Sequence, residues 1–380
     1  MDKKNEIELK IGEPLPYAIV LKGGQIRFPA GHKVTRDILR MLREGQITQI
    51  EIDWPVRSDD SPGLFDEKQP DYPDSIHLKS VYLMKRSREI IASISEPFHT
   101  PLSILHDSLK RLWIDPTDRI DLDSIYTQVD VLMNSISRSN RVPACIGWNA
   151  RADDFFAAHM VDTLMLSTWL GFRLNLSGKE IRSLATAGIL HDIGELFINR
   201  QILLRNTTLD SSEMGRIKEH PRKSVEWMKR AGINDELSHR IVLRHHERLD
   251  GSGYPFNIRG KILAPIDSIF AFADVFTALV STRPYRNAIT RRLALKMILE
   301  QKGKWFSDEI INELASIIGF YPPGSLVQLR NGDYVIIIGP PASSSWEGIK
   351  IDLEDPGHNF ETMNLLALQN DYIIREIAFC

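Results

Sequence analysis

The feature that most constrains this chain is a long stretch of apolar, helix-patterned sequence, from about residue 153 to residue 318, which histidines and aspartates interrupt. Within its segment SLATAGILHDIGELFI, His191 and Asp192 stand side by side with no polar face around them. A buried carboxylate needs a cation or a metal ion as its partner. One such pair alone is more often a core histidine held by a neighbouring carboxylate. The pair points to metal only if further ligands accompany it.

Further ligand-type residues do occur in apolar, helix-patterned segments of the same stretch. They are His159, His220, His245, His246 and Asp274. Imidazole nitrogens and carboxylate oxygens suit iron, manganese, zinc or nickel, and Asp192 has two oxygens with which to bridge two ions. Successive residues of a helix point about 100° apart, so His245 and His246 can act together only at a helix end. We therefore expect a helical domain that holds at least two metal ions.

The remaining sequence predicts a modular, multidomain α+β protein, because 380 residues exceed what one domain usually needs. Residues 1–75 alternate apolar and polar side chains, with one amphipathic segment, TRDILRMLREGQ, and a proline-rich, acidic connection at 58–74; we expect a β-rich module. Residues 76–148 predict a helical connector, 149–320 the metal-binding helical domain, and 321–380 a small β-module. Asn331-Gly332 predicts a hairpin turn in that last module.

The composition excludes several classes of protein. Forty-seven basic and fifty acidic residues give a net charge of −3, too balanced for a protein that coats polymeric nucleic acid. Cys145 and Cys380 are the only cysteines, which excludes a disulfide framework or a thiolate metal cage and fits a reducing cytoplasm. The start, MDKKNEIELK, lacks a signal-peptide apolar region, and the apolar runs are short, so we expect no membrane insertion.

Three segments together resemble the HD-GYP family, a branch of the HD superfamily of metal-dependent phosphohydrolases. They are HDIGE at 191–195, HHERLDGSGYP at 245–255 and ADVFTALVSTRPYR at 273–286. The resemblance covers roughly residues 150–320. It implies an all-α HD-type catalytic domain with a di- or trinuclear, often iron, centre, and hydrolysis of cyclic di-GMP to pGpG, GMP or both.

The resemblance also implies roles for individual residues. One metal ion is assigned to His159, His191, Asp192 and Asp274, and the other to Asp192, His220, His245 and His246. Trinuclear members carry a glutamate where this chain has Phe155, so two divalent ions are expected, with iron preferred to manganese. The residues implied to face the substrate phosphates are Tyr254 with Gly253, and Arg283 with Arg286. Asp153 is implied to assist proton transfer, although it could equally cap a helix.

The pattern departs from the family at two positions. Glu195 stands where a phosphate-facing lysine is usual, and Thr277 stands where an aspartate is common. Four residues separate His191 from Glu195, which predicts that they share a helical face near the metals. Glu195 could then serve catalysis, ligate a metal, repel phosphate or bend away into solvent. Glu247 and Asp250 could orient imidazoles by hydrogen bonding.

Several functional interpretations stay open. The preferred one is a cyclic di-GMP phosphodiesterase with activity that Glu195 could reduce. The first alternative is a weakly active or inactive cyclic di-GMP sensor or protein-interaction module. Another nucleotide or phosphoester substrate and, more remotely, an oxygenase are the others. The flanking modules carry no recognisable metal, nucleotide or nucleic-acid motif, so we expect them to serve regulation, homodimerisation or binding of protein partners.

Overall fold

The structure is a computed structural model, and it describes residues 18–21, 26–28, 47–51, 74–115, 121–148, 155–204, 210–260, 263–282, 288–329, 331–339, 347–351, 362–364 and 373–377. The chain divides into two compact units, Met1–Asp71 and Tyr72–Cys380. In the first, strands β1 (Ala18–Leu21), β2 (Ile26–Phe28) and β3 (Ile47–Glu51) form an antiparallel sheet of order β2-β1-β3. The helix predicted within residues 35–46 and nearly all of the predicted connection at 58–74 lie outside the described residues.

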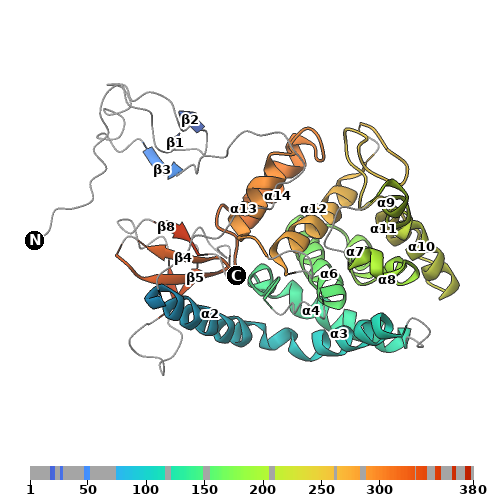
Figure 1. The fold of residues 1–380 in the computed structure, drawn as a ribbon, viewed down its shortest axis with the longest axis horizontal. Coiled ribbons are helices and arrows are strands. Elements are labelled where there is room, and N and C mark those ends of the chain that lie inside the picture. Colours follow the sequence, from blue (N-terminus) through green and yellow to red (C-terminus); the bar gives the residue numbers. More distant parts are fainter. Residues whose placement is uncertain are drawn as a thin grey trace, which may run out of the picture. The chain divides into compact units, whose positions relative to one another are not determined.

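Helices form most of the second unit (Figure 1). The first group spans the predicted helical connector and consists of α2 (Asp74–Ser95), η1 (Glu96–Phe98), α3 (His99–Ile114), α4 (Leu122–Ser137) and α5 (Val142–Cys145). The next group is α6 (Phe155–Arg173), α7 (Gly178–Leu190), η2 (Ile193–Phe197), α8 (Arg200–Leu203), α9 (Ser211–Ile217), α10 (His220–Arg230) and α11 (Glu236–Arg244). The last is α12 (Pro265–Val280), α13 (Arg291–Leu299) and α14 (Asp308–Ile318).

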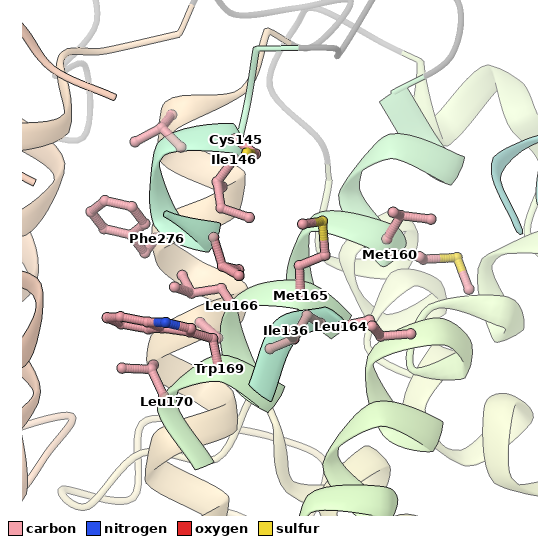
Figure 2. Close-up of a cluster of buried hydrophobic side chains, with 14 of the residues drawn as sticks. Ile136, Cys145, Ile146, Met160, Leu164, Met165, Leu166, Trp169, Leu170 and Phe276 are labelled. Atoms are coloured by element: carbon pink, nitrogen blue, oxygen red, sulfur yellow. The ribbon is translucent and has the colours of Figure 1, made fainter. Parts of the chain in front are cut away.

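Helix α6 is the central element of this unit. All its residues from Phe155 to Gly171 are buried, and it packs against α3, α4, α7 and α12. Figure 2 shows part of the surrounding core, with Met165 and Trp169 of α6 near Ile136 of α4 and Phe276 of α12. A helix that is apolar on every side belongs in a core rather than at a surface. A metal ligand on α6 is therefore deep in the protein.

A small antiparallel sheet follows the helices. Its strands are β4 (Leu326–Leu329), β5 (Tyr334–Gly339), β6 (Glu347–Ile351), β7 (Thr362–Asn364) and β8 (Ile373–Glu376), in the order β7-β6-β5-β4-β8. Asn331 and Gly332 lie in the turn between β4 and β5, and Gly332 has a φ of +94°, which confirms the predicted turn. Ile336 and Ile349 belong to the same buried cluster as the helical core, so helices and sheet share one core.

The predicted α+β character is confirmed, with a mostly helical body and a β-module after it. The predicted boundaries near residues 148 and 320 fall inside the second compact unit and stay predictions. No helix in the described ranges combines the length and the apolarity that crossing a bilayer requires.

Candidate metal centre

The structure brings together the seven side chains predicted as metal ligands. His159 lies in α6 and Asp274 in α12. The other five lie at helix ends: His191 after α7, Asp192 before η2, His220 at the start of α10, and His245 and His246 after α11. The sequence pattern places His191, Asp192 and His220 within helices, whereas a helix end is predicted, and found, at His245 and His246. Helix α11 ends at Arg244, and this ending lets two consecutive histidines approach the same centre.

Asp192 lies in the middle, and each of its carboxylate oxygens faces a different pair of imidazoles. Oδ2 is 3.6 Å from His159 Nε2 and 3.3 Å from His191 Nε2. Oδ1 is 3.3 Å from His220 Nε2 and 3.6 Å from His245 Nε2. The donor atoms accordingly form two groups, each compact enough to hold one ion: His159, His191 and Asp192; and Asp192, His220, His245 and His246. Asp192 belongs to both groups.

Asp274 lies beside both groups. Its Oδ1 is 3.0 Å from His159 Nε2 and 3.7 Å from His191 Nε2. Its Oδ2 is 4.0 Å from His246 Nδ1. A second carboxylate at this place adds negative charge and a further oxygen ligand next to the first group.

Three of the histidines are oriented by the end of the helix that precedes them. The Nδ1 atoms of His191, His220 and His245 lie 3.0, 2.8 and 2.6 Å from the carbonyl oxygens three residues earlier, at Gly188, Ile217 and Val242. A carbonyl only accepts hydrogen bonds, so each Nδ1 carries the proton and each Nε2 keeps its lone pair for a metal. Glu247 and Asp250, which we had considered for this role, bind backbone N–H groups of residues 252–258 instead.

His159 is oriented differently, by side chains. Its Nδ1 lies 3.3 Å from Thr277 Oγ1, which itself donates to the Asp274 carbonyl at 3.0 Å. The Thr277 hydroxyl therefore accepts the Nδ1 proton of His159, and Thr163 Oγ1 lies 2.9 Å from the same oxygen. The departure from the family at Thr277 thus keeps an acceptor for the imidazole, although a neutral one.

The sequence is similar to proteins of a known family. Residues 131–310 match the family model described as HD domain. The chain carries an HD domain. It is 27% identical over 237 residues to a cyclic di-GMP phosphodiesterase of Pseudomonas aeruginosa, covering 62% of this chain and 56% of the relative. It is 39% identical over 145 residues to the cyclic di-GMP phosphodiesterase response regulator RpfG of Xanthomonas campestris, covering 37% of this chain and 38% of the relative.

A third relative is a 3'3'-cGAMP-specific phosphodiesterase of Vibrio cholerae, 30% identical over 158 residues, which cover 41% of this chain and 30% of the relative. The matched segments span little more than half of the first relative and less of the others. The family resemblance predicted from the three motifs is confirmed.

The HD domain implies a divalent metal, and the buried donor set fits one. His191 and His245 have no exposed surface, and Asp192 is 8% exposed. Burial alone would raise the pKa of Asp192, but neighbouring imidazoles outweigh it and hold that pKa well below its usual range. Burial would lower the pKa of His191, yet Asp192 and Asp274 raise it to about 10. The carboxylates thus stay ionised and attract positive charge, which divalent ions can supply in place of protons.

In the second group, the pKa values of His245 and His246 shift in the opposite direction to that of His191. Burial lowers the pKa of His245, and burial together with the charge of its neighbours holds the pKa of His246 well below its usual range. Their neutral forms are the ones that ligate metals. The imidazoles are too close together for all of them to be protonated at once. This mutual repulsion favours metal ligation over protonation.

Glu195 lies in η2 of the HD domain, half-buried. The expectation that it shares a helical face with His191 is wrong, because α7 ends at Leu190 and a separate 3-10 turn begins at Ile193. Its carboxylate is still near the centre. Burial lowers the pKa of His220, but Asp192 and, after it, Glu195 raise that pKa above its ordinary value. Glu195 also adds to the raised pKa of Tyr254, after burial and the aspartates.

The loop after α11 brings Tyr254 against the second group of candidate ligands. The ring centroid of Tyr254 lies 4.6 Å from that of His246, and its N–H donates to the His246 carbonyl at 3.2 Å. A side chain at Gly253 would place its Cβ 2.4 Å from the same carbonyl oxygen, so only glycine fits there. Glu247 accepts from the N–H of Phe256 at 2.6 Å, which holds the loop in place. Burial raises the pKa of Tyr254, so its hydroxyl keeps its proton.

Three predicted site residues, Asp153, Arg283 and Arg286, lie outside the described residues. Sequence reasoning missed Thr163, whose position four residues after His159 on α6 was the available signal. It also missed Lys218, whose Nζ lies 5.5 Å from the centroid of the Tyr254 ring. Lys218 precedes the candidate ligand His220 by two residues, but only the folded loop brings Tyr254 next to it.

Proposed function

We propose that this chain is a metal-dependent phosphodiesterase that hydrolyses cyclic di-GMP to pGpG, GMP or both. The observation that carries the proposal is the Asp192 carboxylate, whose oxygens face two separate groups of imidazoles. Such a bridging carboxylate suits a dinuclear centre of the kind that acts on phosphoesters. The relatives described above are phosphodiesterases of cyclic dinucleotides, which supports a substrate of this class, with cyclic di-GMP preferred.

In this proposal, one ion, iron or manganese, is held by His159, His191, Asp192 and Asp274. The other is held by Asp192, His220, His245 and His246. Bound divalent ions supply Lewis acidity, which lowers the pKa of water toward neutrality and offsets charge on the phosphoryl oxygens. The protein contributes fixed imidazole tautomers, ionised carboxylates and a site that excludes bulk water.

Substrate binding is assigned to the rim of the centre. Tyr254 keeps its phenolic proton and can donate a hydrogen bond to a phosphate oxygen, while Gly253 lets the loop approach. Lys218 adds a positive charge beside the tyrosine ring. Arg283 and Arg286 complete the proposed phosphate contacts, because their guanidinium groups match phosphate oxygens in pairs. Asp153 and Glu195 are the proposed proton-transfer groups, and Asp192 organises the metals.

A specific observation favours an alternative, a cyclic di-GMP sensor or protein-interaction module with little activity. Glu195 is close enough for its charge to act on both His220 and Tyr254. A carboxylate there opposes an approaching phosphate, where a lysine would attract it. In this alternative the metals shape a binding site, and turnover is slow.

The test is anaerobic purification with metal analysis, followed by incubation with cyclic di-GMP under iron or manganese and chromatography of the products. We expect two metal ions per chain and formation of pGpG or GMP. Two ions with bound but intact substrate would instead support the sensor. A protein that takes up no metal under any condition would refute both.

A further inference from the structure

Two side chains beside the proposed centre have no part in the function described so far. Phe256 is a large apolar residue with 50% of its surface exposed. The guanidinium carbon of Arg222 lies 5.3 Å from the centroid of its ring, in a cation–π arrangement. A single exposed apolar residue is common on protein surfaces and needs no explanation by itself. The position of this pair makes it informative.

Both members lie close to the metal centre along the chain. Phe256 follows Tyr254 by two residues, and Arg222 follows His220 by two. Two residues span at most about 7 Å. The Cα atoms of Phe256 and Arg222 therefore lie within the length of one nucleotide of Tyr254 and His220, respectively. The Phe256 backbone is also held firmly, because its N–H donates to Glu247 Oε1 at 2.6 Å and Glu247 is itself 2% exposed.

We propose that Phe256 and Arg222 form a guanine-binding subsite that sets the base preference of the site. The proposal rests on the function proposed above. The exposed surface of the phenyl ring offers a base an apolar face for stacking, which is sequence-tolerant and strong. The guanidinium offers two parallel N–H donors, which match the O6 and N7 acceptors of guanine. Adenine carries an amino group where guanine has O6, so the same fork disfavours adenine.

The negative charge of Glu195 explains why a contact to the base would contribute to substrate affinity. Glu195 weakens attraction of the substrate phosphate, because its carboxylate lies where its charge reaches Tyr254. A base carries no net charge, so stacking on it and hydrogen bonds to it are less sensitive to that carboxylate than contacts to the phosphate are. Binding through Phe256 and Arg222 therefore offsets affinity that the inverted charge removes, and it does so selectively for guanine.

The test compares Phe256→Ala, Arg222→Lys and wild type in the metal-loaded full chain. Arg230→Gln is the matched control, since Arg230 is an exposed arginine at the other end of the same helix, with 78% of its side chain exposed. Calorimetry gives the Kd for cyclic di-GMP and cyclic di-AMP. Turnover of cyclic di-GMP and of bis(4-nitrophenyl) phosphate, a diester without a base, gives kcat and KM. Thermal unfolding checks that each variant folds.

We expect Phe256→Ala to raise the Kd for cyclic di-GMP about tenfold, as loss of one stacked base does. Turnover of the base-free diester should not change. Arg222→Lys keeps the charge and loses the fork, so it should weaken cyclic di-GMP binding and leave cyclic di-AMP binding as it was. Arg230→Gln should match wild type in every assay.

Two results would overturn the subsite. One is wild-type affinity for cyclic di-GMP in both variants; the other is an equal loss for the base-free diester, which would mean damage to the centre. Failure of the proposed function looks different, because wild type itself would then neither bind nor cleave a cyclic dinucleotide, and the subsite would fall with it. If the protein binds without turnover, the Kd values still decide the inference.

Discussion

Replacing Thr277 by valine tests whether a hydroxyl orients His159. Thr277 has no exposed surface, and its Oγ1 donates to the Asp274 carbonyl while it accepts from His159 Nδ1 at 3.3 Å. Thr163 lies 2.9 Å from the same oxygen. Valine has nearly the shape of threonine and lacks the hydroxyl. The substitution therefore removes this hydrogen-bonding group and changes little else.

The expected size of the effect follows from the hydrogen bond that is lost. The buried Nδ1 proton of His159 loses its acceptor, which costs about 1–3 kcal/mol of free energy of unfolding. Each kcal/mol lowers the Tm of a domain somewhat smaller than this unit by about 2–4 °C. Loss of a partner that orients a metal-ligating histidine typically costs about 10- to 100-fold in metal affinity. Metal binding should therefore weaken more visibly than the fold.

The assay is titration of Mn²⁺ into metal-stripped protein by calorimetry, with thermal unfolding of both forms. Thr168→Val is the matched control, because Thr168 lies in α6, has no exposed surface, and its Oγ1 has no hydrogen-bond partner within the described part of the chain. That substitution should be neutral or stabilising. If Thr277→Val binds Mn²⁺ as tightly as Thr168→Val, the hydroxyl does not orient the ligand.

Three further predictions follow from the centre and its surroundings. Asp192→Asn should lower metal content at both positions together, measured by elemental analysis, whereas the exposed Asp130→Asn should leave it unchanged; loss of one ion alone would contradict the bridge. Glu195→Lys should raise kcat/KM for cyclic di-GMP about 2- to 30-fold, because two unit charges change at about 0.2–1 kcal/mol each; a fall would show that the carboxylate serves the reaction. Burial raises the pKa of Asp162 to about 7 from 3.8, so the unfolded chain ionises first, and the free energy of unfolding falls as pH rises between these values, by at most about 4 kcal/mol. Asp162→Asn should remove that slope in denaturant titrations across this range, and an unchanged slope would assign it to other groups.

The residues that the structure gathers at the centre could be predicted because their chemistry conflicts with their surroundings. His191 and Asp192 interrupt an apolar run where water is excluded, and only pairing or metal resolves that conflict. The structure places Asp192 between the other candidates, as a bridge requires. The family resemblance added their division between two ions, which stays a proposal.

Helix ends were the weak point of the sequence reasoning. The spacing of four residues between His191 and Glu195 predicts a common face only if the helix continues, and α7 stops at Leu190. Gly188 lies inside the last turn of α7 and the next glycine, Gly194, comes after the stop, so no proline or glycine stands at the stop itself. At Gly194 a Cβ would lie 2.1 Å from the His220 carbonyl oxygen, so close packing against α10 sets the path of this segment. Such a contact is tertiary and leaves no local pattern.

The contact between Arg222 and Phe256 could not be predicted for the same reason, because it too is tertiary. Thirty-four residues separate Arg222 from Phe256, and nothing in either segment refers to the other. The loop after α11 places Phe256 beside Arg222, and Glu247 holds that loop by accepting from the N–H groups of Phe256 and Ile258. Glu247 was noticed in the sequence as a possible partner of an imidazole. Its actual role is to hold this loop.

The helix ends explain how the centre is built from local and distant contacts. The last carbonyls of a helix lack intrahelical partners, and His191, His220 and His245 donate to such carbonyls through Nδ1. One hydrogen bond thus satisfies the helix end, selects the tautomer and directs Nε2 toward the centre. His159 lies within α6, where carbonyls are already paired, and so takes its acceptor from Thr277 on another helix. Orientation is therefore encoded locally for three ligands and by tertiary packing for His159, which makes His159 the ligand most sensitive to substitutions in α12.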